Sequence, residues 1–175
     1  SMLARPGAHV LPRPQPDLKL ASGFCPTAAL ADAGVNLTLG TDGAASNTDL
    51  DMLGEMRSAA LLAKAVAQRA DAMPAADVLA MATINAARAL GRDDIGSLEP
   101  GKWADLCAID LSGLEQQPLY DPVSQIVYAS NRSQVTHTWI GGRAVLRERK
   151  LTTLDEADLL QQVAAYREKI AGARP

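Results

Sequence analysis

A short unit near the start of the chain restricts the fold more than any other feature. Residues 27–33 favour a helix, and Gly34 ends it because glycine readily adopts the left-handed conformation that follows a helix. Residues 35–39 have the pattern of a strand, and residues 40–47 form a polar loop. This order of helix, strand and loop is the repeating unit of parallel α/β proteins, in which the loops after the strands carry the chemistry.

The segments on either side of this unit add helices and a brief strand. Residues 8–11 are apolar and are followed by three prolines, so we expect a brief strand, an extended segment and then a loop over 17–23. Apolar residues at helical spacing predict one amphipathic helix over 50–70. A second, more deeply buried helix is expected from 74 to 90, with Gly91 at its end.

The second half of the chain has the pattern of a small β unit. Short alternating runs predict strands at 104–109, 135–140 and 143–146, and Gly141-Gly142 indicates a tight hairpin between the last two. Residues 155–171 predict a closing amphipathic helix with Thr153 or Asp155 as its cap. The predicted organisation is therefore three segments, 1–91, 92–150 and 151–175.

Composition and charge exclude several classes of protein. Seventeen basic and twenty acidic residues give a net charge of −3, so we expect no nucleic-acid partner. No apolar run approaches the length of a membrane span, and the start of the chain lacks a signal-peptide pattern. Cys25 and Cys107 form no C-x-x-C pair, which favours a reduced, cytoplasmic protein. Ser1-Met2 has the form of a remnant of tag removal.

Asp42 is the candidate for chemistry, because it follows a predicted parallel strand in a loop of small residues. An acid at that place can face a pocket. The structural alternative is an Asx-turn or a helix cap in a glycine-rich connection. A calcium loop is excluded, because Ala44 and Asn47 occupy positions where that motif needs an acid or amide and a glycine.

A longer pattern surrounds Asp42. Residues 40–52 resemble the G-T-D-G-A-A-S-N-N-D-L-D-M segment of methylthioadenosine and S-adenosylhomocysteine deaminases, within the amidohydrolase superfamily. The resemblance continues upstream and downstream and covers nearly the whole chain from Leu18 onward. Its other segments are 18–23, 82–91, 96–105, 121–128 and 141–143.

The resemblance implies the fold class α/β, with 1–91 as the C-terminal segment of a metal-dependent TIM-barrel hydrolase, 92–150 as a small composite β domain and 151–175 as a C-terminal helix. It implies that Asp42 ligates a divalent metal, zinc or alternatively iron, and carries protons for a water that attacks a purine nucleoside. Ser46 and Asn47 match the family's pocket loop as substrate contacts, with capping of the next helix as their alternative role. Trp103 and Asp105 match a turn in which we expect burial and a hydrogen bond.

The sequence also departs from the family. The other family ligands, a His-x-His pair and two further histidines, have no match, and we interpret His9 and His137 as a loop and a strand residue. Residues 12–17 replace the family's His-Cys-Pro-x-Ser-Asn. The two hypotheses are therefore a deaminase of which this chain is a truncated part, inactive alone, and a non-catalytic relic or interaction module. We expect the apolar edge at 35–39 to be exposed and to require a homo-oligomer or a complementing N-terminal part.

Overall fold

The structure of the protein is a computed structural model that describes residues 7–172; Ser1-Met2 lies outside them. Its α-helices are α1 (Pro14–Lys19), α2 (Thr27–Asp32), α3 (Ala44–Asn47), α4 (Met52–Ala67), α5 (Ala75–Met81), α6 (Ile84–Ala89), α7 (Pro122–Tyr128) and α8 (Glu156–Gly172). Its strands are β1 (His9–Val10), β2 (Asn36–Leu37), β3 (Leu106–Ile109), β4 (Val135–Ile140), β5 (Arg143–Arg147) and β6 (Lys150–Leu151). Two 3₁₀ turns, η2 (Leu114–Gln116) and η3 (Arg132–Gln134), flank α7.

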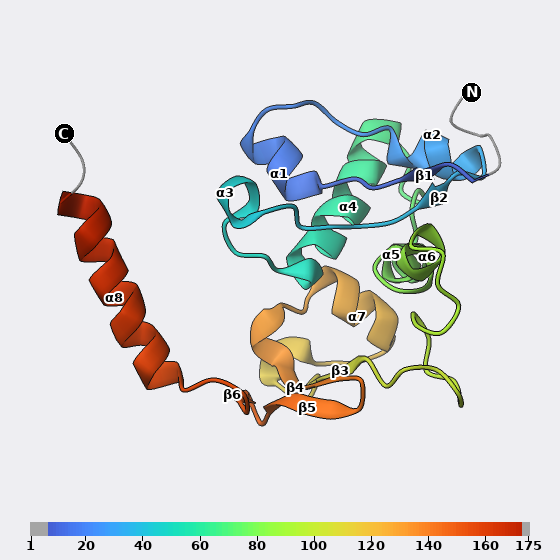
Figure 1. The fold of residues 1–175 in the computed structure, drawn as a ribbon. Coiled ribbons are helices and arrows are strands. Elements are labelled where there is room, and N and C mark those ends of the chain that lie inside the picture. Colours follow the sequence, from blue (N-terminus) through green and yellow to red (C-terminus); the bar gives the residue numbers. More distant parts are fainter. Residues whose placement is uncertain (1–6, 173–175) are drawn as a thin grey trace.

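The elements form layers with α4 and α5 at the centre. In Figure 1, β1 and β2 lie beside α1 to α4, α7 lies below α4 and α5, and the sheet β3 to β6 forms the base. The buried core is shared by β2, α4, α5 and α7, with Met56, Ala60, Val78, Met81 and Val127 among its least exposed side chains. The described residues contain both helices and small sheets but no closed barrel, which is the α/β class expected for part of a barrel protein. No helix among them is long and apolar enough to cross a bilayer.

The parallel pair β1 and β2 is the only described remnant of a parallel sheet, and it is buried on its apolar side. His9 pairs with Asn36 and Val10 with Leu37. Val35, Leu37 and Leu39 are each less than a tenth exposed. Helices α2 and α6 contact β2, and the three side chains belong to the same core cluster as residues of α4 and α5. The prediction that the apolar side chains of 35–39 are exposed was therefore wrong.

The proline-rich segment is a helix, where the sequence predicted extended chain and loop. Helix α1 begins at Pro14, and both Pro14 and Pro16 are buried. The first turn of a helix has backbone N–H groups without intrahelical partners, so prolines there lose no hydrogen bond and their fixed φ suits the helix. Pro14 and Pro16 are therefore compatible with a helix start here, and the proline-rich segment is not extended throughout.

The single helix predicted over 74–90 is two helices, α5 and α6, separated at Thr83. The Thr83 side chain donates a hydrogen bond to the carbonyl oxygen of Leu79 at 2.8 Å, and the backbone of Thr83 (φ −129°, ψ −100°) leaves the helical region. A threonine that bonds back to the preceding turn competes with the helix ladder. By contrast, the helix predicted over 50–70 is present as α4, with Asp51 as its N-cap.

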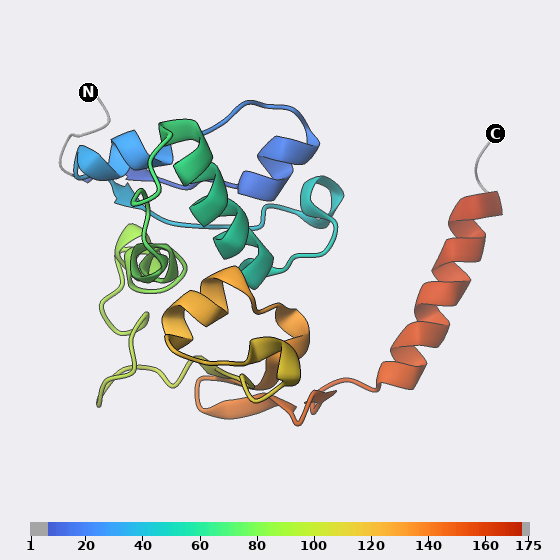
Figure 2. The same ribbon diagram turned by 180° about the vertical axis from the view of Figure 1, so that it is seen from behind.

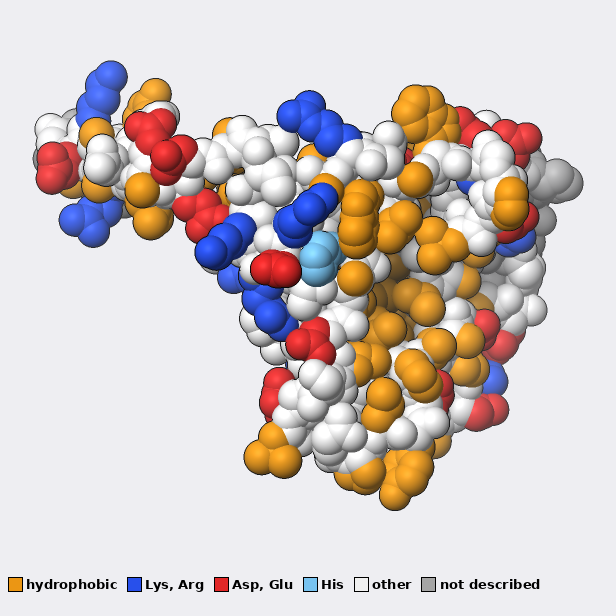
Figure 3. Space-filling model, turned by 90° about the horizontal axis from the view of Figure 1, so that it is seen from below, with side chains coloured by type: hydrophobic (Ala, Val, Ile, Leu, Met, Phe, Trp, Pro, Cys, Tyr) orange, Lys and Arg blue, Asp and Glu red, His pale blue; other side chains and the backbone are white. Residues whose placement is uncertain are grey.

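The antiparallel sheet has the order β3-β4-β5-β6, and its hairpin is confirmed. Gly141 and Gly142 have φ of 56° and 77°, as a two-residue hairpin turn requires. Asp105 accepts a hydrogen bond from Gly141 N at 2.6 Å, as expected, but Trp103 is 57% exposed and its predicted burial was wrong. No strand residue of this sheet is buried, and Figure 3 shows hydrophobic side chains around a hollow on the underside of the molecule.

Candidate functional site

Asp42 lies where the two parallel strands end together. Thr38 N donates to Val10 O at 2.9 Å, so the chain after β2 leaves the pair beside the chain after β1. Asp42 has φ of +60°, a left-handed conformation that aspartate tolerates better than most residues. Asp42 is thus placed between β2 and α3, after the carboxyl end of the strands, as the sequence predicted. Figure 1 shows the connection from β2 to α3.

The Asp42 carboxylate has a partner at each oxygen. Its Oδ1 accepts from Gly43 N at 2.8 Å, and its Oδ2 accepts from Arg13 Nη1 at 2.8 Å. These contacts lower the pKa of Asp42, with the Gly43 N–H as the largest cause, followed by the Ser46 hydroxyl, and Arg13 adding to them. The side chain remains about a third exposed. Asp42 is therefore an ionised, solvent-accessible carboxylate at neutral pH.

Arg13 is a site residue whose contact the sequence did not reveal. It lies in the loop after β1, within the segment that departs from the family pattern, and its Nη2 also lies 3.7 Å from Asp17 Oδ1. The guanidinium supplies a cation at Asp42 from within the chain. The sequence of residues 12–17 does not indicate this pairing, because it depends on β1 and β2 being neighbours.

A second feature behind Asp42 is the fully buried Glu55 of α4. Its Oε2 accepts from Gln15 N at 3.1 Å, and its Oε1 accepts from Asn47 Nδ2. Asn47 Oδ1 in turn accepts from Leu50 N at 2.7 Å. Glu55 therefore ties α1, which follows β1, to α3, which follows β2. The sequence contains one signal for it, an acid on the otherwise apolar stripe of Met56, Ala59 and Ala63.

Ser46 and Asn47, the predicted substrate contacts, lie in α3 and differ in exposure. The Ser46 hydroxyl donates to Gly43 O at 3.0 Å on the exposed side of the loop, whereas the Asn47 amide is buried and engaged by Glu55 and Leu50. Neither residue caps α4. The N-cap of α4 is Asp51, whose side chain accepts a hydrogen bond from Leu53 N at 2.9 Å.

Burial raises the pKa of Glu55 above its ordinary value, against the lowering by its hydrogen bonds from Gln15 and Asn47. The folded protein thus holds this proton more tightly than the unfolded chain, and lowering the pH from neutral toward 4.5, the ordinary value, should stabilise the fold through Glu55. Replacing Glu55 by glutamine should remove this gain. Urea unfolding of both proteins across that window tests the prediction, and other carboxyls cancel because both proteins contain them. Identical pH slopes for both proteins would contradict it.

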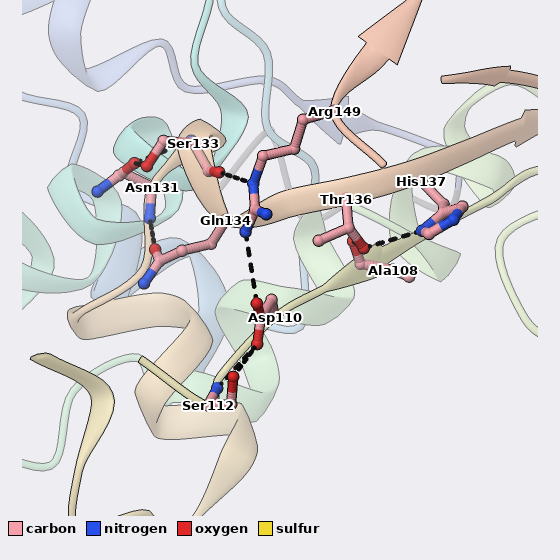
Figure 4. Close-up of polar contacts among 9 residues, drawn as sticks. All are labelled: Ala108, Asp110, Ser112, Asn131, Ser133, Gln134, Thr136, His137 and Arg149. Atoms are coloured by element: carbon pink, nitrogen blue, oxygen red, sulfur yellow. Dashed lines mark hydrogen bonds and ion pairs between the residues drawn. The ribbon is translucent and has the colours of Figure 1, made fainter. Parts of the chain in front are cut away.

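The two histidines of the chain are not grouped with Asp42 as metal ligands. His9 is exposed in β1, not in a loop as predicted, and its Nδ1 lies 2.8 Å from Asn36 Nδ2. His137 lies in β4 as expected, with its ring stacked on Trp139 at 5.4 Å and its Nδ1 3.0 Å from Thr136 Oγ1. Figure 4 shows it beside a network in which Asp110 accepts from Ser112 and Arg149. Within residues 7–172 no three His, Cys, Asp or Glu side chains are grouped to hold a metal ion.

Comparison with known proteins places the chain in a family. The profile of the amidohydrolase family matches residues 2–145. The chain belongs to the amidohydrolase family. It is 50% identical to the 5-methylthioadenosine/S-adenosylhomocysteine deaminase of Teredinibacter turnerae over 99% of this chain and 40% of that protein.

Two solved amidohydrolase structures share the fold. An adenosine deaminase from Xanthomonas campestris with bound zinc is 51% identical, with a TM-score of 0.94 over 98% of this chain and 39% of that one. An atrazine chlorohydrolase from Arthrobacter aurescens, complexed with zinc, is 28% identical, with a TM-score of 0.84 over 93% of this chain and 36% of that one. The chain thus spans about 40% of the length of the relatives it matches.

Proposed function

We propose that the chain is the C-terminal part of an enzyme that removes ammonia, by hydrolysis, from the purine of methylthioadenosine, S-adenosylhomocysteine or adenosine. The observation that carries the proposal is the 50% identity to a deaminase along almost the entire chain. The matched region contains residues 40–52, the family segment around Asp42. Ammonia release from these nucleosides in the presence of the complementing part of a relative tests it.

We propose Asp42 as metal ligand and catalytic carboxylate of the intact enzyme, supported by its position at the carboxyl end of β2 and its ionised state. Ser46 is the better supported substrate contact, because its hydroxyl lies on the exposed side of the loop. Asn47 is retained as a proposed contact, although its amide already bonds Glu55. Residues 1–91, 92–150 and 151–175 remain our proposed domain division, and the free Cys25 and Cys107 favour a cytoplasmic setting.

Zinc is the metal we propose for the intact enzyme, with iron as the alternative, because the Xanthomonas and Arthrobacter structures contain zinc. The described residues of this chain do not fit such a centre by themselves. Asp42 is paired with Arg13, and within residues 7–172 no group of three His, Cys, Asp or Glu side chains includes it. The partner of the site would therefore be a complementing N-terminal part or another copy of the chain.

The alternative function is a non-catalytic relic or interaction module. The Arg13–Asp42 ion pair favours it, because a guanidinium of the chain itself already neutralises the carboxylate. In the deaminase proposal that pair must open when the missing part binds.

We expect the isolated chain to purify without a stoichiometric transition metal, since one carboxylate is not a selective site. Elemental analysis of the purified protein measures zinc and iron per chain. Asp42→Ala is the variant to compare, with Asp93→Ala, an exposed aspartate in a loop, as its control. One equivalent of tightly held zinc that is lost only in Asp42→Ala would contradict the prediction.

A further inference from the structure

Helix α8 carries an apolar stripe that the rest of the described chain leaves uncovered. The stripe consists of Leu159, Val163, Tyr166 and Ile170, which are 42%, 56%, 63% and 61% exposed. No residue of α8 is buried. Figures 1 and 2 agree that the helix stands apart from the body of the molecule, to which the segment after β6 joins it.

An amphipathic helix of this length needs packing for its stability. The 17 residues of α8 only slightly exceed the length of about 12–15 residues below which isolated helices are marginal in water, and most helices in proteins are stabilised by packing of their apolar face. The N-terminal end of α8 is well held, because Asp155 accepts from Ala157 N and Asp158 N and because Leu151 N donates to Glu156. In the remaining turns the apolar stripe is the surface through which packing could stabilise the helix. We therefore expect a partner to cover the stripe.

The spacing of the stripe suits a second copy of itself in antiparallel orientation. Its four residues are separated by four, three and four positions, a sequence that reads the same in both directions. In an antiparallel pair Leu159 therefore lies opposite Ile170 of a second copy, and Val163 opposite Tyr166. Alternating steps of three and four are also the pattern by which paired helices bury a seam.

Charge along α8 favours the same orientation. The first turn is acidic, with Glu156 and Asp158, and the last turns carry Arg167 and Lys169 beside the stripe. At 3.6 residues per turn, Asp158 and Lys169 fall on the same side of the stripe, and antiparallel pairing brings them within about 3 Å of each other along the axis. Parallel pairing would instead place acid beside acid. We propose that α8 is a self-association surface through which two copies of this chain pair antiparallel.

The oligomeric state of the full chain tests the surface. Sedimentation velocity at micromolar concentration should show a dimer, and Val163→Glu in the stripe should give a monomer. Gln161→Glu introduces the same charge on the opposite side of α8 and should leave the dimer intact. A monomeric unmodified chain would overturn the proposal, and would point to the part of the amidohydrolase relatives outside this chain as the cover of α8. Dimerisation of the Val163→Glu variant at undiminished affinity would also overturn it.

Charge reversal tests the orientation. Asp158→Lys and Lys169→Asp should each weaken self-association by about tenfold, since two pairs per dimer turn from attractive to repulsive. An equal mixture of the two variants should regain the affinity of the unmodified chain, because both mixed pairs are again of opposite charge. Salt should reduce these differences. If Asp158→Lys leaves the affinity unchanged, or if the mixture is no tighter than either variant, the antiparallel pairing is wrong.

Discussion

Gly96→Ala is expected to lower the free energy of unfolding by about 2–4 kcal/mol, through backbone strain and overpacking together. Gly96 has φ of +88°, a conformation that L side chains rarely adopt. A Cβ at this position would lie 2.8 Å from Ala87 Cβ, 3.0 Å from Ile84 Cα and 3.2 Å from Thr83 O. Two of these three neighbours are backbone atoms of α6 and its cap, which cannot move aside as a flexible side chain would.

Gly101→Ala is the matched control for this prediction. Gly101 has φ of +91°, almost the same as Gly96, but no atom lies within 4 Å of the added Cβ. It should therefore show only the strain of about 1–2 kcal/mol. Urea unfolding of both variants gives the difference, which isolates the contact with α6. Equal destabilisation of the two variants would show that α6 does not pack against Gly96.

The sequence predicted those elements that depend on local signals. Helix α8 has its cap at Asp155, and the hairpin has Gly141-Gly142 at the turn, so neither depends on distant residues. The alternating prolines predict an extended segment where helix α1 begins, although the first turn of a helix accepts proline. The break at Thr83 was missed because apolar periodicity continues through it and only the hydroxyl contact to Leu79 separates α5 from α6.

The candidate site was predictable to a different degree. The position of Asp42 after a parallel strand followed from the order of elements in the sequence. The ion pair with Arg13 did not, because it joins residues that meet only once β1 and β2 pair. The contact between Glu55 of α4 and Gln15 of α1 joins residues 40 positions apart, and its only local sign is an acid on an apolar helix face. Long-range polar contacts of this kind can be identified only once the fold is known.

The largest expected effect concerns activity. We expect the chain alone not to deaminate methylthioadenosine, S-adenosylhomocysteine or adenosine, because the other family ligands are absent from its sequence. Mixing it with the part of the Teredinibacter turnerae deaminase that this chain does not cover, with zinc added, should restore turnover through Asp42. The two proteins are 50% identical over the shared part, so the surfaces that meet should be similar in shape.

Asp42→Asn should lower the restored rate by about 10²–10⁴-fold, the usual contribution of a positioned proton-transfer group. Asp93→Asn removes a charge from an exposed loop and should leave the restored rate unchanged. The Arg13–Asp42 pair opposes the rescue, so Arg13→Gln, which removes the guanidinium, should raise the rate.

Ammonia release with and without the complementing part measures each effect. Turnover by the 175-residue chain alone, lost in Asp42→Asn, would show that its own residues complete a site and would overturn the incomplete-site interpretation. Binding of the two parts without turnover, also with Arg13→Gln, would instead favour the non-catalytic module.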